Sequence, residues 1–536
     1  MRATFISHLF VLLVSCWCVP VLADVTDGHF VMQLREQVPT KAGEEFTKSV
    51  YRTEKWKPSE TAIIVCDMWD SHHCYNAVQR VNDVVGRMNE LLTTARSDGA
   101  MIIHAPSSCM EAYVDHPGRK LAQQAPAAKN LPSDIGKWCY QIPQEEKGQY
   151  PIDQSDGGED DDPKQHEAWA KELAAKGLNP KSPWKRQVRA IDIHDVDAIS
   201  DSGVEVWNLL ESRGIKNVIL LGVHTNMCVL GRPFGLRQMS KNGRNVVLMR
   251  DLTDTMYNPA AAPFVNHHTG TDLIVQHIER HVCPTVLSTD IIGGKPHRFF
   301  DDKRPTIAMV ISEFEYETYR TLPEFAMKHL GKDYRVVYAI NDDKEQHSID
   351  GLSILKDADV AVISAWRRTP PPKQLQAIRD FCQSGKSVIG IRTSSHAFVT
   401  RYGKTPDGAA AWPEFDQDVF GCEYTGHHGN HADKGDAATK VWVNSEKRDN
   451  PILNGLPSQK FAVHSWLYKS LPLKETAAAN VLLWGEVRGK DKTQPVAWIA
   501  SSEPKVFYTS LGSQGDFQHP AFQRLLANAI GWAAGK

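Results

Sequence analysis

The chain has 536 residues, with 61 Lys and Arg against 64 Asp and Glu, and its formal net charge is −3. Hydrophobic residues make up 41% and charged residues 23%, which is ordinary for folded protein and argues against disorder throughout the chain. The near-neutral charge argues against nucleic acid as a partner. The 10 Cys are too few for a disulfide scaffold, and the length predicts two or three domains.

The N-terminus has the layout of a cleaved export signal. Arg2 supplies a positive start, a mostly apolar run extends from Phe5 to Val14, and the segment closes on the small residue Ala23. We therefore expect an exported protein, periplasmic or secreted, from which residues 1–23 are removed. Lipid anchoring at Cys16 is an alternative, whereas the apolar run is short of the roughly 20 residues that a membrane span needs.

A polar arm, residues 24–57, is expected to be irregular and to lie on the surface. In residues 58–290, short apolar runs alternate with segments of helical periodicity, and a stretch rich in Pro, Gly and charge at 120–190 predicts an insertion. The alternation predicts a mostly parallel sheet with helices on both faces. The expected strands are 61–66, 101–103, 218–221 and 246–249, and the expected helices are 78–92, 204–212, 234–241 and 273–281.

A polar linker is expected at 291–304, and a second alternating series fills residues 305–536. The predicted fold class is therefore α/β, with two three-layer domains that are built differently. The expected strands of the second domain are 306–311, 336–339, 360–364, 388–391, 441–444, 481–484, 495–499 and 506–509, and its expected helices are 372–384 and 521–533.

Two strand ends in the first domain carry candidate chemistry, because ligands in open α/β sheets bind beyond the carboxyl ends of strands. Asp67 directly follows the strand 61–66, and the strand 218–221 leads into Gly-Val-His-Thr-Asn-Met-Cys-Val at 222–229. This places Cys228 near a helix N-terminus, which stabilises a thiolate, while a nearby carboxylate could take the thiol proton. The alternative is a small buried Cys and an Asp that caps a helix.

The same stretches resemble the isochorismatase-like cysteine hydrolases. Residues 61–69 look like the opening strand of that family, and residues 222–229 resemble its Gly-x-x-Thr-Asn-x-Cys-Val segment. The resemblance implies a three-layer α/β fold with a catalytic Asp, Lys and Cys, of which Asp67 and Cys228 match the Asp and the Cys. It also implies a cis peptide bond at Val223–His224 that helps to shape an oxyanion hole.

The family lysine has no counterpart in its usual window. Residues 188–193 hold Arg189 but no Lys, and His194 lies just outside the window. A cation is needed there to keep the thiol and the carboxylate in working protonation states. Arg189 and His194 are therefore the candidate catalytic cations, and Lys185, brought in by the insertion, is an alternative.

The residues before the cysteine complete the predicted site. We expect His224, Thr225 and Asn226 to contact the substrate, although such histidines are often hydrogen-bonded loop residues. The stretch after the strand 101–103 lacks the Asp-x-His metal pair of the nicotinamidase branch. We therefore expect no metal and no cofactor.

The second domain has a His-rich loop, His427-His428-Gly-Asn-His431, and two later apolar stretches, 494–498 and 506–512. These resemble the ThuA-like (trehalose utilisation) family, whose flavodoxin-like fold is similar to that of class I glutamine amidotransferases. The amidotransferase Cys is replaced by the turn Arg-Thr-Ser-Ser at 392–395, so glutaminase chemistry is not expected. We predict that His428 and His431 line a cleft for a carbohydrate or another small molecule; a metal site is the alternative.

These patterns predict an exported cysteine-dependent hydrolase that cleaves a C–N bond in a small amide-type substrate, with a ThuA-like domain that binds a sugar-like ligand. Relatives of the first domain commonly self-associate, so a homo-oligomer is also an expectation. The alternative is a non-catalytic small-molecule or carbohydrate binding protein made of two enzyme-like folds. The missing Lys and amidotransferase Cys favour this alternative, and the intact Thr-Asn-x-Cys segment opposes it.

Overall fold

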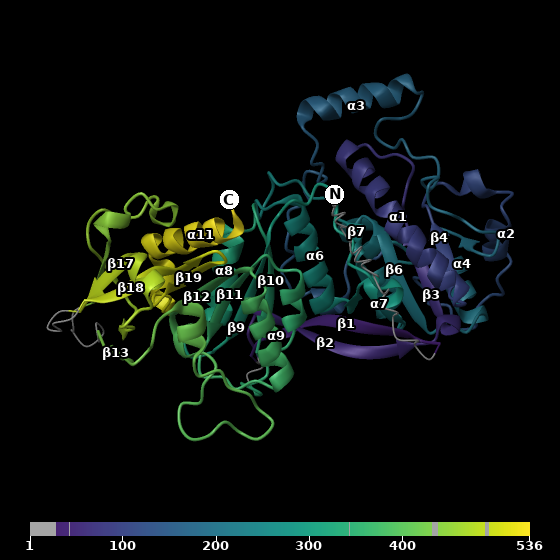
Figure 1. The fold of residues 1–536 in the computed structure, drawn as a ribbon. Coiled ribbons are helices and arrows are strands. Elements are labelled where there is room, and N and C mark those ends of the chain that lie inside the picture. Colours follow the sequence, from purple (N-terminus) through teal and green to yellow (C-terminus); the bar gives the residue numbers. More distant parts are fainter. Residues whose placement is uncertain (1–27, 42, 342–343, 431–437, 488–492) are drawn as a thin grey trace, which may run out of the picture.

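The computed structural model describes residues 28–41, 43–341, 344–430, 438–487 and 493–536. Two large sheets lie in separate halves of the molecule (Figure 1), as the α/β prediction requires. The expected signal peptide, with Cys16, lies outside the described residues. Within these ranges, no helix is long and apolar enough to cross a membrane.

The first sheet has the strand order β2-β1-β8-β7-β6-β3-β4-β5, and its strands from β8 to β5 run parallel. The central strand β3 lies between β6 and β4, so the segments after β3 and β6 meet at the same edge of the sheet. The parallel strands are β3 (Thr61–Cys66), β4 (Met101–Ala105), β5 (Ala198–Ile199), β6 (Asn217–Val223), β7 (Asn245–Asp254) and β8 (Thr285–Val286).

Helices cover both faces of this sheet, and this explains why β3 is apolar throughout. Ala62 and Ile64 face one core, and Ile63 and Val65 face the other. The first core is closed by α4 (Gly203–Ser212), α5 (Leu236–Lys241) and α6 (His267–His281), and the second by α1 (Tyr75–Ser97) and α7 (Thr289–Ile292).

The prediction that the arm, residues 24–57, is irregular is wrong for most of its length. Strands β1 (Phe30–Pro39) and β2 (Thr47–Trp56) pair antiparallel, and β1 adds to the sheet beside β8. Phe30, Met32 and Leu34 alternate with more exposed residues and are buried. Polar residues on the outer face of the hairpin lower its overall hydrophobicity, so composition hides the two-residue period of the strand.

The second sheet is mixed, with the order β10-β9-β11-β12-β19-β18-β17-β14-β15. The strands from β10 to β19 are parallel, and β18, β17, β14 and β15 continue the sheet in antiparallel fashion. Its strands are β9 (Thr306–Ser312), β10 (Arg335–Ile340), β11 (Val360–Ala365), β12 (Ser387–Ile391), β14 (Thr439–Val443), β15 (Phe461–Val463), β17 (Val481–Glu486), β18 (Gln494–Ser502) and β19 (Lys505–Thr509).

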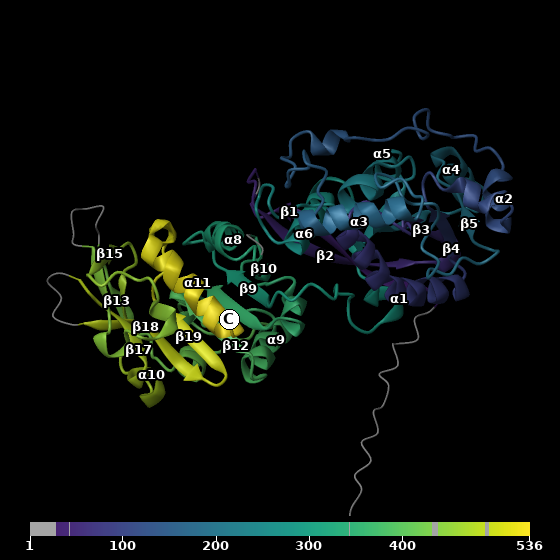
Figure 2. The same ribbon diagram turned by 90° about the horizontal axis from the view of Figure 1, so that it is seen from above.

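Helices also cover both faces of the second sheet (Figure 2). α8 (Thr318–His329) and the C-terminal α11 (Pro520–Ala534) close one core, and α9 (Pro372–Gln383) closes the other. A small separate ladder joins β13 (Gly426–His428) to β16 (Leu467–Lys469). The remaining helices are α2 (Pro117–Gln123), α3 (Pro163–Ala175) and α10 (Glu475–Ala479).

The predicted insertion packs over the end of the first sheet that carries Cys228. Cys139 N donates a hydrogen bond to Gly231 O at 2.8 Å. A Cβ added at Gly231 would lie 2.4 Å from the Trp138 ring. Tyr150 donates its hydroxyl to the carbonyl of Asn226 at 3.3 Å. The insertion therefore lies against the segment that follows β6.

Gly222 fixes the spacing between β6 and β3, and we expect Gly222→Ala to destabilise the protein. Gly222 has φ 105°, and an added Cβ would lie 2.1 Å from Cys66 O. The strained backbone alone should lower the free energy of unfolding by about 1–3 kcal/mol, measured as a shift of the urea midpoint.

Gly86→Ala is the matched control. Gly86 lies in the exposed interior of α1 with open space around the added Cβ, so this change should raise the free energy of unfolding by roughly 0.5–1 kcal/mol. Equal effects of the two substitutions would contradict the assigned role of Gly222.

Candidate active site

Two strand ends bring Asp67 and Cys228 together. β3 and β6 pair in parallel, with Cys66 opposite Gly222, so the residues that follow both strands emerge at one edge. The thiol of Cys228 and the carboxylate of Asp67 lie close enough to shift each other's pKa. Asp67 is fully buried and Cys228 is 8% exposed. The acid and the thiol that the sequence placed at separate strand ends therefore lie side by side.

Arg232 is the cation beside this pair. Its Nε donates to Asp67 Oδ2 at 2.9 Å, and its positive charge lowers the pKa of the Cys228 thiol. Arg232 N donates to Cys228 O, which places the arginine one helical turn after the cysteine. The guanidinium lies over the Trp138 ring of the insertion, 5.3 Å from its centroid.

The structure does not bring Arg189 or His194 to the thiol. Both are exposed, and their segment lies against α1, where Asn89 bonds the backbone of Ala190 and Asp192. In the described part of the chain, no hydrogen bond or ion pair joins either side chain to the candidate site. Both predicted cations precede the cysteine in the sequence, whereas Arg232 belongs to the turn that follows it.

Asp67 is held in a fixed orientation. Its backbone has φ 45°, in the left-handed region, and its amide donates to Ala105 O at 3.1 Å. Oδ1 accepts the amide of Ser107 at 2.7 Å, while Oδ2 accepts Arg232. Burial raises the pKa of this carboxyl, and Arg232 with Ser107 opposes that rise. A carboxyl with a raised pKa and two fixed donors suits a group that takes up and returns a proton.

The surroundings of the Cys228 sulfur favour the protonated thiol. Burial raises the pKa of the Cys228 thiol, the neighbouring Asp67 raises it further, and Arg232 lowers it. Cys228 lies inside a π-helical turn, Thr225–Val229, rather than at an exposed helix N-terminus. The expected thiolate stabilisation by a helix end is therefore outweighed by burial.

The residues before the cysteine hold the turn in place. The expected cis peptide bond at Val223–His224 is present. Thr225 Oγ1 lies 2.7 Å from Thr253 Oγ1. Asn226 Nδ2 donates to Gln154 of the insertion at 2.7 Å and to the carbonyl of Met256 at 2.9 Å. Thr225 and Asn226 are thus buried and hydrogen-bonded by the protein itself.

His224 contributes to a set of aromatic rings next to this turn. It is 3% exposed, and burial lowers its pKa to about 4. The His72 ring lies edge-on to it at 4.9 Å. Trp69 and Trp184 stack at 4.5 Å. Trp69 Nε1 donates to the carbonyl of Ser107 at 3.1 Å, and the amide of the same residue donates to Asp67. The sequence signalled only Trp69, because Trp184 comes from the insertion.

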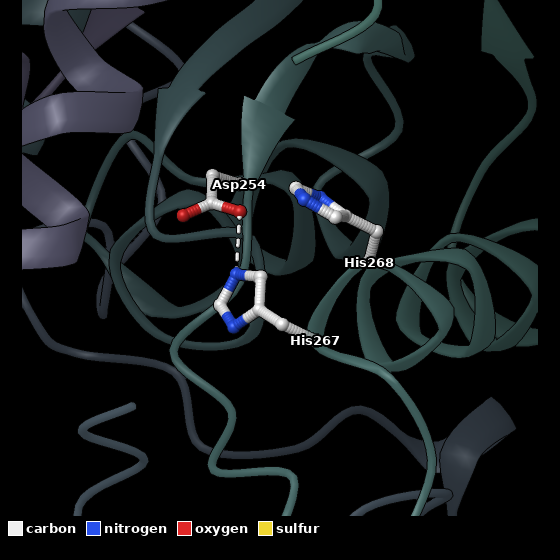
Figure 3. Close-up of side chains that lie close together, drawn as sticks. All are labelled: Asp254, His267 and His268. Carbon is white, nitrogen blue, oxygen red and sulfur yellow. Dashed lines mark hydrogen bonds and ion pairs between the residues drawn. The ribbon is translucent and has the colours of Figure 1, made fainter. Parts of the chain in front are cut away.

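Asp254, His267 and His268 have donor atoms within 4.8 Å of one another, a spacing that could hold a metal ion (Figure 3). His267 Nε2 lies 2.9 Å from Asp254 Oδ1, and His268 Nε2 lies 2.9 Å from Asp301. Arg80 donates to the other oxygen of Asp254 at 2.8 Å. The guanidinium already neutralises this carboxylate and would repel a cation, so the donor set fits a buried ion network better than a metal centre.

The second domain has its candidate residues at strand ends as well. His428 ends β13 and is half-buried, whereas His431 lies outside the described residues. The turn 392–395 follows β12 and carries Arg392 at φ 45°. Ser395 Oγ lies 3.1 Å from His396 Nδ1 in the same turn.

Comparisons with known proteins agree with this division of the chain. The family model for the isochorismatase domain matches residues 61–265, and the model described as trehalose utilisation (ThuA) matches residues 309–533. No curated protein matches the chain.

Solved structures resemble the two halves separately. A ThuA-like protein from Bacteroides uniformis is 16% identical and covers 45% of this chain and 95% of its own, with a TM-score of 0.33. A cysteine hydrolase from Pseudomonas syringae pathovar phaseolicola is 17% identical and covers 44% of this chain and 92% of its own, with a TM-score of 0.27. An isochorismatase family protein from Burkholderia thailandensis is 15% identical and covers 44% and 94%, with a TM-score of 0.25. The chain thus joins an isochorismatase domain to a ThuA domain.

Proposed function

We propose that the isochorismatase domain hydrolyses a C–N bond in a small amide-type substrate, with Cys228 as the nucleophile. The observation that carries the proposal is the buried thiol in contact with Asp67, while Arg232 holds the carboxylate at 2.9 Å. Nucleophile, proton acceptor and cation are in contact before any substrate binds.

The reaction proceeds in two halves. Cys228 Sγ attacks the carbonyl carbon while its proton moves to Asp67, and backbone N–H groups of the turn at 224–228 stabilise the oxyanion. The C–N bond breaks as Asp67 returns the proton to the leaving nitrogen, which leaves a thioester on the sulfur. Water then attacks the thioester, Asp67 accepts one of its protons, and that proton returns to the sulfur as the acid departs. Arg232 stabilises Asp67 in its charged form whenever the proton is on the sulfur.

The proposal extends to the location of the protein and to a ligand of its second domain. The signal-like N-terminus supports export, and the half-buried His428 at the end of β13 supports a sugar-like ligand in the ThuA domain. A homo-oligomer is part of the same proposal, because relatives of the first domain commonly self-associate. The alternative, a binding protein without turnover, makes a different prediction for the variants below.

Removal of either reacting group should abolish turnover. Cys228→Ser and Asp67→Asn should each lower kcat/KM in an amide screen by roughly 10²–10⁴-fold, because a poorer nucleophile or a lost proton acceptor blocks acyl transfer. Release of the free amine measures the rate. Wild-type protein that binds an amide without releasing amine would support the binding-protein alternative instead.

Arg232→Gln should lower kcat/KM by about 10- to 100-fold, since it removes a charge-assisted hydrogen bond from Asp67. Arg189→Gln is the matched control and should retain wild-type activity, because Arg189 is exposed and the residues that follow it bond to α1. Amine release measures both variants. If Arg189→Gln lost activity and Arg232→Gln kept it, Arg189 rather than Arg232 would be the catalytic cation.

The pH profile should have a single acid limb. Asp67 must be ionised to accept the proton, and burial raises its pKa above the usual 3.8, so kcat/KM should fall as the pH drops through a value above 3.8. His224, with a pKa lowered to about 4, and His72, whose pKa lies well below 6.5, stay neutral near pH 7. We therefore expect no limb from these histidines near pH 7. A profile without the acid limb would contradict the assignment of Asp67 as the proton acceptor.

A further inference from the structure

Two arginines follow adjacent strands of the ThuA domain in strained conformations. Arg367 comes after β11 with φ 52°, and Arg392 comes directly after β12 with φ 45°. Arg367 N donates to His396 O at 3.2 Å, so the two turns are tied together. Residues other than glycine rarely adopt this conformation, and such strain concentrates at functional sites.

Arg392 is a buried cation without an acidic partner. Its side chain is 5% exposed, Nη1 donates to Ser465 Oγ at 2.8 Å, and the guanidinium carbon lies 4.5 Å from the centre of the Tyr316 ring. Its Nε is buried with no hydrogen-bond partner. Within the described residues, no carboxylate forms an ion pair with it. A buried charge of this kind is costly unless an anion pairs with it.

The neighbouring acids are committed to other donors. Asp516 accepts the hydroxyl of Ser465 and the amide of Gly512 on one oxygen, and the amide of His464 at 2.7 Å on the other. It therefore reaches the arginine only through the serine hydroxyl. Glu313 accepts the amides of Tyr316 at 2.7 Å and of Thr318 at 3.0 Å. Neither acid therefore forms a direct ion pair with Arg392, and an anionic ligand could pair with its positive charge.

Aromatic rings lie beside Arg392, and the charge of Arg367 lowers the pKa of His396 and opposes the raised pKa of Tyr424. His396 stacks on Tyr424 at 4.1 Å, and the Tyr424 hydroxyl lies 2.9 Å from His427 Nδ1. Tyr468 lies 5.4 Å from the guanidinium of Arg392. Tyr424 is half-buried and His427 is exposed, so this wall reaches the solvent. Flat apolar faces next to a cation suit a sugar ring, whose C–H face packs against aromatic rings while its charged substituent meets the arginine.

We propose that the ThuA domain binds a carbohydrate that carries an oxyanion, a carboxylate or a sulfate ester, and that Arg392 with Arg367 holds the anionic group. This proposal rests on the sugar-like ligand of the proposed function and adds that the ligand is negatively charged. A guanidinium fork matches both oxyanions in two-point geometry. The aromatic wall of Tyr316, Tyr424 and Tyr468 supplies the contacts to the ring.

Calorimetry on the full chain tests this with four probes: sodium D-glucuronate, D-glucose 6-sulfate, D-glucose and inorganic sulfate. At least one charged sugar should bind about 10-fold or more tightly than glucose and than inorganic sulfate, and which of the two does so identifies the oxyanion. Binding of glucose with equal affinity would keep the sugar site and overturn its anionic character. Equal binding of inorganic sulfate would leave a plain anion site, and binding of none of the probes would overturn the whole proposal.

Arg392→Gln and Arg367→Gln should each weaken binding of the charged sugar by about 10-fold or more. Arg379→Gln is the matched control, because Arg379 packs on Trp412 at 4.0 Å elsewhere in the domain, and it should bind like the wild type. Unchanged binding in both arginine variants would overturn the assignment.

A third measurement needs no variant and so covers a failure of Arg392→Gln to fold. The charged sugar should protect Arg367 of wild-type protein from phenylglyoxal by about 10-fold or more, read by peptide mapping, while Arg379 is unprotected. Equal labelling of Arg367 with and without the sugar would contradict the proposal. Amine release by Cys228 is measured separately, so failure of this site and failure of the hydrolase are distinguishable.

Discussion

The ion pair between Arg232 and Asp67 is the constraint on which the proposed chemistry of the first domain depends. Both oxygens of Asp67 accept fixed donors, Ser107 N at 2.7 Å and Arg232 Nε at 2.9 Å. This holds the carboxylate beside the thiol of Cys228 in a site where burial raises the pKa of the acid. Without the guanidinium, the pKa of the carboxyl would rise further. The parallel pairing of β3 and β6 serves this contact by bringing the two strand ends to one edge.

The strands and helices could be predicted where burial leaves a recognisable pattern of apolar residues in the sequence. β3, β6 and β9 are buried on both faces, so each is a continuous apolar run. The hairpin of β1 and β2 was not predictable in this way, because it exposes one face and its polar residues outnumber the apolar ones. Its alternation is also weakened towards Pro39, where burial declines.

The candidate site shows the same division. Asp67 and Cys228 could be found because each follows a strong strand signal, and strand ends are where open sheets bind ligands. Arg232 could not be found, since an arginine one turn after a cysteine has no special pattern; only the packing of Trp138 over Gly231 and the position of the turn aim it at the acid. Trp184 was hidden for a related reason, because it reaches the site from an insertion whose path the sequence does not reveal.

The two domains share a backbone feature, a left-handed residue directly after a central strand, but the residues there carry opposite charges. Asp67 and Arg392 each follow a central parallel strand with φ 45°, and each is almost fully buried. The acid in the first domain has its cation, Arg232, inside the protein, and under the proposed function it takes up and returns a proton. The arginine in the second domain has no internal anion, and under the proposed assignment its charge is completed by the ligand. At the turn after β12, the long side chain of Arg392 reaches past the strand end to Ser465, and under the proposed assignment this position serves recognition.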